Sequence, residues 1–218
     1  AAAGAGGGGG RTVHPHKGPC NGKTFGTSGV VYAVATENGT RPHANPHETG
    51  EVEVTMSSVS NGKPSCVVGN EAPSDYCYTK SIPQSSVTVD FKARRVADIE
   101  KYVIRHGSQY GGAYRLKSWV LEASVNEKDW VVIDRQEHDR SPLPDAGFST
   151  AAFPLGDEKL VVVKQDGGFR YVKLTQTGLN SGMPGYRPND MLFLAGIDFN
   201  GSLLPPPAGG AMDGGTTT

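Results

Sequence analysis

The sequence predicts an all-β fold in which antiparallel strands form a sandwich, with one short helix near the N-terminus. Three observations lead to this prediction. Apolar residues alternate with polar residues in several short runs, which is the period of a half-buried strand. Turn-forming residues separate these runs. Helical and strand segments do not alternate along the chain, which disfavours a parallel α/β sheet.

The composition divides the chain into one domain and two tails. The 218 residues are long enough for a single sandwich with a sizeable core. Residues 1–10 are Gly- and Ala-rich and residues 205–218 are rich in Pro, Gly and Thr, so neither end offers apolar side chains to a core. We therefore expect a folded domain over residues 11–204 with a flexible tail on each side.

The first predicted element is the helix, in the stretch "GTSGVVYAVATENG". Val30 and Val34 are spaced i, i+4 there, between flanking glycines. Strands follow. In "VTVDF", Val87, Val89 and Phe91 share one face. The runs "KYVIRH", "LKSWVLEAS" and "WVVID" come next, and the polar link "VNEKD" joins the last two as a hairpin.

The second half of the chain continues the pattern. "KLVVVK" and "FRYVKLTQT" are joined through Asp-Gly-Gly, a strong turn signal. In the final run, "MLFLAGIDFNG", Leu192 and Leu194 are in phase with each other but out of phase with Ile197 and Phe199. A β-bulge at Ala195–Gly196 would restore a single buried face, and glycine tolerates such a bulge.

Charge and cysteine content narrow the function classes. The net charge of -1 disfavours sequence-independent nucleic-acid binding, which needs a basic surface. There is no run of about 18 apolar residues, so we expect no membrane span. Cys20, Cys66 and Cys77 are an odd number without a Cys-x-x-Cys pair, which does not resemble a disulfide framework and favours a reducing compartment.

Arg105-His106-Gly107 raises the question of catalysis, because histidine phosphatases carry this triplet after a strand. Such an enzyme needs a helix after the histidine and a parallel sheet around it, whereas a Gly- and Tyr-rich loop and a second strand follow here. We therefore expect a strand–loop–strand unit and no enzyme.

The combination "VDFKARRV…YVIRHGS…LKSWVLEASVNEKDWVVID" with "FRYVKLTQTG…LFLAGIDFNG" resembles the discoidin, or coagulation factor V/VIII type C, family, most closely its intracellular branch found beside BTB domains and in protist proteins. The resemblance implies a galactose-binding-like jelly-roll sandwich that binds glycans, lipid head groups or proteins without catalysis. It also implies that Trp119 and Trp130 match the two tryptophans that pack in the sandwich of this family.

The resemblance places binding on loops at one end of the sandwich, which agrees with the general use of variable loops on a rigid scaffold. Three loops supply candidate contacts. The first contains Arg105, His106, Gln109, Tyr110, Tyr114 and Arg115. The second contains Asn70, Glu71, Asp75 and Tyr76. The third, at residues 177–190, is long and presents Met183, Tyr186 and Arg187 as interface anchors. For each loop an ordinary polar or disordered connection remains the alternative.

We expect no cofactor, since the sequence has no dense cluster of acidic residues. Asp198 in "GIDF" is the one position where the resemblance would supply a calcium ligand. The primary functional hypothesis is a protein-binding module within a larger intracellular or cytoskeletal assembly, in the cytoplasm or a cilium. The alternative is a lectin-like module that binds carbohydrate.

Overall fold

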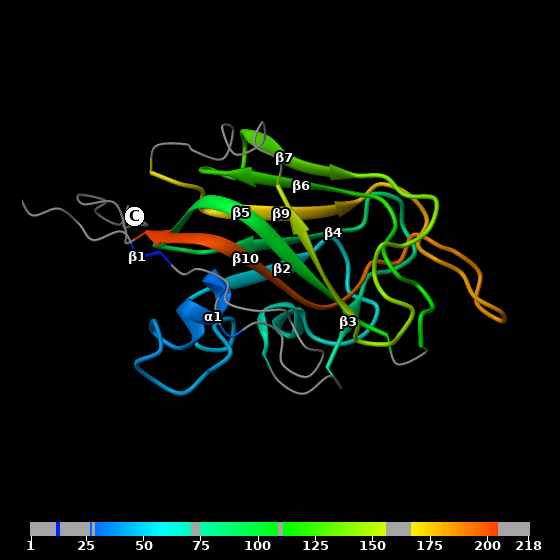
Figure 1. Ribbon diagram of the computed structural model, residues 1–218, viewed down its shortest axis with the longest axis horizontal. Helices are drawn as coiled ribbons and strands as arrows, with labels where there is room; N and C mark the ends of the chain where they lie inside the picture. Colours follow the sequence, from blue (N-terminus) through cyan, green and yellow to red (C-terminus); the bar gives the residue numbers. More distant parts are fainter. Residues whose placement is uncertain are drawn as a thin grey trace, which may run out of the picture.

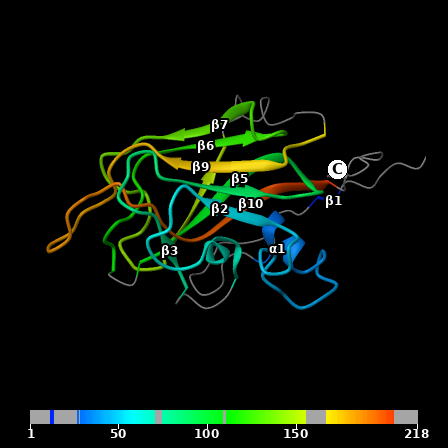
Figure 2. The ribbon, with the colours of Figure 1, turned by 180° about the vertical axis from the view of Figure 1, so that it is seen from behind.

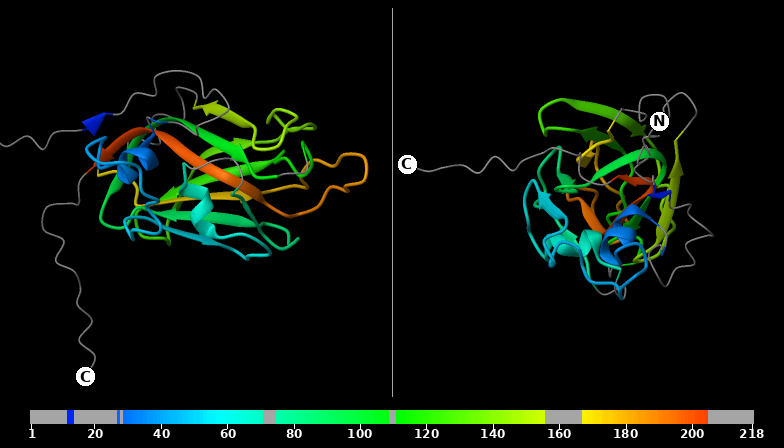
Figure 3. Two further views of the ribbon diagram at one scale, coloured as in Figure 1. Left: turned by 90° about the horizontal axis from the view of Figure 1, so that it is seen from below. Right: turned by 90° about the vertical axis from the view of Figure 1, so that its left-hand side faces the viewer.

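The computed structural model describes residues 12–13, 27, 29–70, 75–108, 111–155 and 167–204 (Figure 1). Both predicted tails and the run "KLVVVK" lie outside the described residues, as do Glu71, Gln109 and Tyr110. Figure 2 shows the same arrangement from behind, and Figure 3 shows it from below and along its long axis. Two antiparallel sheets face each other, which confirms the predicted sandwich.

Sheet A carries the longest strands. Its order is β1 (Thr12–Val13), β10 (Phe193–Leu204), β5 (Arg95–His106) and β8 (Thr150–Pro154), while β3 (Cys77–Tyr78) pairs with the other end of β10. The described strands of this sheet all pair in the antiparallel sense. Strand β10, the last strand that the structure describes, pairs with β1, β3 and β5. It therefore holds sheet A together.

Sheet B covers the other side of the core. Its order is β2 (Glu53–Met56), β4 (Ser86–Asp90), β9 (Tyr171–Gln176), β6 (Trp119–Ser124) and β7 (Trp130–Gln136). The hairpin predicted across "VNEKD" is confirmed by the antiparallel pairing of β6 with β7. Strand β2 was not among the predicted strands, although apolar and polar residues alternate in "EVEVTM" around it.

The core between the sheets is built from residues that share the inward face of each strand. Leu121 and Leu174 of sheet B are at most 1% exposed, as are Ile104, Ile197 and Phe199 of sheet A. The expected bulge is confirmed by a shift in the β10–β5 register between Leu194 and Gly196. Burying each such aliphatic or aromatic side chain contributes roughly 1.5–3 kcal/mol to stability.

The two tryptophans differ. Trp119 is completely buried, as the resemblance implied. Trp130 pairs with Ser124 at the edge of sheet B and is half-buried, with the Lys173 ammonium 4.0 Å from its ring centre. Because Lys173 lies on the outer face, the expectation that Trp130 packs inside the sandwich is wrong.

The predicted helix is α1 (Val30–Ala35), which packs against β10 (Figure 1). Its N-cap residue, Gly29, has no side chain to accept the first backbone N–H groups. Asp198 on β10 takes that role, because its carboxylate accepts from the amides of Val31 at 2.8 Å and Tyr32 at 3.4 Å. A short 3₁₀ helix, η1 (Pro64–Val68), also packs against β10 and was not predicted.

Candidate functional site

A cavity beside the end of β5 and against η1 joins two of the predicted loops. We call it the loop pocket, and its volume is about 400 Å³. The segment 57–70 with η1 forms one wall, and the residues that lead into β3 form the other. Its lining includes Asn45, Asn61, Lys63, Asp75, Tyr76 and Arg105. Volumes from about 300 Å³ upwards are typical of small-molecule sites.

Arg105 forms the base of the loop pocket and does not sit on a loop. It is the penultimate residue of β5 and is 5% exposed. Its Nη2 donates to the carbonyl oxygens of Ala195 at 2.7 Å and Gly69 at 3.3 Å, and its Nε donates to Ala195 at 3.1 Å. The bulge at Ala195–Gly196 exposes that carbonyl to the guanidinium. Arg105 therefore connects η1 and β10 at the pocket, and its expected place in a loop is corrected.

His106 ends β5 and is also not a loop residue. Its ring is completely buried, and Nε2 lies 2.9 Å from the carbonyl oxygen of Ala113. Burial lowers the pKa of His106 to about 4, so the ring is neutral near pH 7. An enclosed neutral histidine between antiparallel strands is not placed to take up a phosphoryl group, in agreement with the expectation that this triplet is not a phosphatase motif.

Arg115 braces the loop that follows β5. Its Nε donates to Gly112 at 2.8 Å and its Nη1 to Leu143 at 3.0 Å, while Nη2 pairs with Asp145 at 3.1 Å. These bonds give Arg115 a structural role within its loop. This agrees with the alternative of an ordinary polar connection.

The structure brings tyrosines from all three predicted loops together around Phe193. Tyr114 stacks on Phe193 with ring centres 4.7 Å apart, and Tyr78 stacks on it at 4.4 Å. Tyr76 lies 6.3 Å from Phe193, and Tyr186 meets Tyr114 edge-on at 5.5 Å. We call these five residues the aromatic strip. The four tyrosines are half-buried, so the strip presents ring surface next to the loop pocket.

The other predicted residues lie around this centre. Asn70 follows Gly69 at the pocket wall, and its buried Oδ1 makes no hydrogen bond within the described chain. Met183 and Tyr186 form a two-residue β-bridge, so residues 182–188 are a hairpin that projects at the end of the molecule opposite β1 (Figure 1). Met183 is 39% exposed and Arg187 is exposed. The loop predicted at residues 177–190 thus contains a short hairpin.

Asp198 is not placed as an open calcium ligand. Its carboxylate is 4% exposed and accepts three backbone N–H groups, the third from Phe199 at 2.7 Å. Burial raises the pKa of Asp198 to about 7. Among the residues that the structure describes, no group of three or more His, Cys, Asp or Glu side chains could hold a metal ion.

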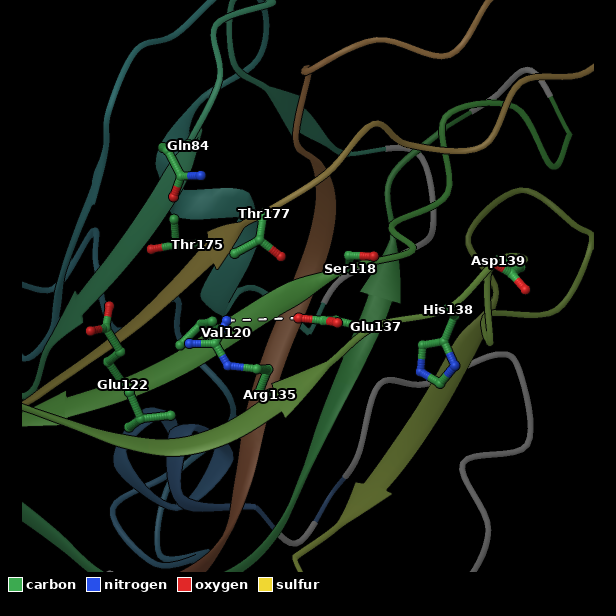
Figure 4. Close-up of a pocket in the computed structure, with 11 residues that line it drawn as sticks. Gln84, Ser118, Val120, Glu122, Arg135, Glu137, His138, Asp139, Thr175 and Thr177 are labelled. Atoms are coloured by element: carbon green, nitrogen blue, oxygen red, sulfur yellow. Dashed lines mark ion pairs between the residues drawn. The ribbon is translucent and has the colours of Figure 1, made fainter.

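A larger and more open cavity, of about 830 Å³, crosses the outer face of sheet B (Figure 4). We call it the sheet groove. Figure 4 shows Thr175 and Glu122 on its strands and Ser118 just before β6, with Arg135 and Glu137 paired at its edge. No predicted site residue lines it. Its polar side chains are those that any solvated face of an alternating sheet carries, so pattern reasoning gave no reason to select it.

Sequence reasoning also missed three members of the loop pocket, Asn45, Asn61 and Lys63. The dipeptide Asn61-Gly62 is the sequence signal that could have pointed to this segment, because it is typical of turns. In the structure Gly62 has a φ of +76°, a conformation that favours glycine.

Among the described residues, no helix is long and apolar enough to cross a membrane.

No protein-family model matches the chain, and no curated protein matches it either. Solved structures do resemble it. One is the carbohydrate-binding module CBM32-3 from a family 31 glycoside hydrolase of Clostridium perfringens, with a TM-score of 0.51 and 11% identity over 70% of this chain and 92% of that module. Another is CpGH89CBM32-5 of the same organism, in complex with GalNAc-β-1,3-galactose, with a TM-score of 0.48 and 14% identity over 69% and 95% of the two chains.

The lectin domain of lectinolysin, complexed with Lewis B antigen, has a TM-score of 0.47 and 15% identity, over 67% of this chain and 90% of that domain. At these identities the likeness concerns the fold. The likeness to CBM32-3, together with the two antiparallel sheets, shows that this chain has the jelly-roll β-sandwich fold that its sequence resemblance implied.

Proposed function

We propose that this protein binds carbohydrate without transforming it, in the loop pocket and across the adjoining aromatic strip. The observation that carries the proposal is the junction at Tyr76, which lines the pocket and also belongs to the strip. A sugar presents C–H groups on one face and hydroxyl groups around its edge. It therefore needs an aromatic ring beside hydrogen-bonding groups of both kinds.

The loop pocket supplies those groups. Lys63 is a donor, Asp75 an acceptor and the Asn61 amide both, and all three side chains are exposed. Arg105 below them is held in place by backbone carbonyls, so the base of the pocket is pre-formed. Pre-organised groups lose little entropy on binding, which favours affinity for a small polar ligand.

The similarity to CBM32-3 supports this proposal in preference to the protein-attachment hypothesis. That module belongs to a glycoside hydrolase and shares the sandwich of this chain. Because a shared fold does not fix function, the pocket and the strip have to carry the argument for this protein.

The test is binding of the full chain to an array of oligosaccharides, with and without calcium, followed by calorimetry on any sugar retained. We expect Tyr76→Ala to weaken binding about tenfold or more, equivalent to roughly 1.4 kcal/mol. Asp75→Asn, at an exposed position, should weaken binding without disturbing the fold. Thr175→Ala in the sheet groove is the matched control and should bind as the unmodified chain does. Absence of any retained sugar, or sensitivity to Thr175→Ala alone, would overturn the proposal.

A second candidate function is attachment to another protein through the 182–188 hairpin. Met183 is 39% exposed and nearby Leu179 is 48% exposed, an arrangement that places apolar surface on a projecting segment. The resemblance to the intracellular discoidin branch points the same way. Met183→Ser combined with Leu179→Ser should then abolish recovery of a stoichiometric partner from native extract and leave sugar binding intact. Recovery unaffected by these changes would remove this candidate.

A further inference from the structure

Two of the three cysteines meet at the wall of the loop pocket. Cys66 lies in η1 and Cys77 opens β3, and their Sγ atoms are 2.8 Å apart. Both sulfurs lie close to the carbonyl oxygen of Leu194, at 3.6 and 3.8 Å. The odd cysteine count argued against a disulfide framework, but it carried no information about which thiols would be neighbours.

The backbone around the two thiols is held firmly. Cys77 pairs with Leu194 across β3 and β10. Gly62 lies so near the backbone of residues 76–77 that a Cβ on it would overlap them. On the other side, the Asn45 amide donates to the carbonyl of Ser65 at 2.9 Å and fixes the start of η1. Bond formation between the sulfurs therefore requires only small side-chain movements.

The two thiols differ in access. Cys66 is half-buried and lines the loop pocket, whereas Cys77 is completely buried behind it. The contact with Cys66, together with burial, raises the pKa of the Cys77 thiol, which therefore stays protonated near pH 7. An oxidant that enters the pocket meets Cys66 first.

We infer that Cys66 and Cys77 are a redox pair that forms a reversible disulfide in the wall of the loop pocket. With a low-molecular-weight disulfide such as oxidised glutathione, the Cys66 thiolate attacks one sulfur and releases one glutathione thiolate. The Cys77 sulfur then loses its proton and attacks the Cys66 sulfur of the mixed disulfide, which releases the second glutathione. Two protein thiols are oxidised and one glutathione disulfide is reduced to two thiols.

The disulfide would close a loop from residue 66 to residue 77. This loop contains Asp75 and Tyr76, which line the pocket. Closing such a loop restricts the unfolded chain and fixes the pocket wall in the folded protein. The pair would thus respond to the redox state at the place where the proposed ligand binds. The inference itself rests on the positions of the sulfurs and not on the identity of that ligand.

The experiment incubates the full chain with an excess of oxidised glutathione, blocks remaining thiols by alkylation and identifies the digested peptides by mass spectrometry. With a protease that cuts after glutamate, and so between the two cysteines at Glu71, we expect a pair of peptides cross-linked through Cys66 and Cys77. The pair should be lighter by two hydrogens than the separate peptides and should be lost after treatment with a dithiol reductant. Cys20→Ser is the matched control and should retain the cross-link, while Cys66→Ser should abolish it.

A second measurement does not depend on the variants folding. The oxidised chain should unfold at a higher temperature than the reduced chain, by roughly 5 °C or more for a domain of this size. Full alkylation of both cysteines after oxidation, or a cross-link that requires Cys20, would overturn the inference. A cross-link formed by a chain that retains no sugar would uphold the inference while removing the proposed carbohydrate function.

Discussion

At the scale of single residues, His106 belongs to a sequence motif that suggests catalysis, but its side chain has a structural role in the folded protein. Its Nε2 binds the carbonyl of Ala113, and its Nδ1 is buried without a hydrogen-bond partner in the described chain. A second proton on this ring would place an unpaired charge in the interior, which is costly. The residue therefore supports the turn after β5 only while it is neutral.

We expect this histidine to make the fold sensitive to acid. In the unfolded chain its imidazole is protonated below its ordinary pKa of about 6.5, whereas burial lowers the pKa of His106 in the folded protein to about 4. Between these values the unfolded state binds more protons, so stability is retained above about pH 6.5 and falls as the pH drops toward 4. The loss approaches roughly 3 kcal/mol. NMR titration of the imidazole signals checks this, and a folded-state midpoint near 6.5 would contradict it.

At the scale of elements, α1 depends on a strand that lies far away in the sequence. A six-residue helix is marginal by itself. Its N-terminal amides are satisfied by Asp198 of β10, and Gly29 allows the helix to approach that carboxylate closely. The helix and β10 therefore form as one unit.

This dependence predicts that Gly29→Ala destabilises the protein by about 1–3 kcal/mol, because the added Cβ would overlap the Asp198 carboxylate. Gly178→Ala is the matched control: its Cβ would meet Ser118 at an ordinary 3.5 Å, so the change should stay within about 0.5 kcal/mol. Urea unfolding of the two variants gives both numbers. Equal stability of the two would show that the helix does not need this approach.

At the scale of the whole molecule, a buried polar chain joins the two sheets. The Trp119 Nε1 of β6 donates to the Tyr102 hydroxyl of β5 at 2.8 Å, and that hydroxyl donates to Asp134 of β7 at 2.7 Å. Burial raises the pKa of Tyr102, so the hydroxyl remains a neutral donor. Such a chain fixes one arrangement of the sheets, because a sliding of either sheet would leave buried groups unpaired.

Removal of the Tyr102 hydroxyl should therefore lower the stability of the protein more than the loss of so small a group would suggest. We expect Tyr102→Phe to lower the free energy of unfolding by about 1–3 kcal/mol, since the Trp119 N–H and the Asp134 carboxylate each lose a partner. Tyr171→Phe, on the outer face of sheet B, is the control and should change it by about 0.5 kcal/mol or less. Chemical denaturation of both variants measures their free energies of unfolding. Similar losses in the two variants would contradict the proposed role of the buried hydrogen bonds.

The sequence predicted the sandwich well because the inward residues keep a strict period of two, and even the bulge in β10 followed from the broken phase after Leu194. It did not predict which side chains would meet. Trp130 and Arg105 both fit the alternating pattern of a strand. Their contacts, however, are with Lys173 and Ala195, which lie far away in the sequence. Three tyrosines of the aromatic strip, Tyr76, Tyr114 and Tyr186, come from loops that the sequence singled out separately, whereas Tyr78 lies in β3 and was not selected.

The course of β10 has one more consequence. Thr12 pairs with Leu203 near one end of this strand, while Leu194, near its other end, lies beside the thiols of the loop pocket. Nine residue steps of about 3.3 Å separate the two positions, so Thr12 and Leu203 lie roughly 30 Å from the loop pocket. A tether fused at either residue would therefore start well away from the pocket, and copies could be strung in series or displayed on a support with every pocket left uncovered.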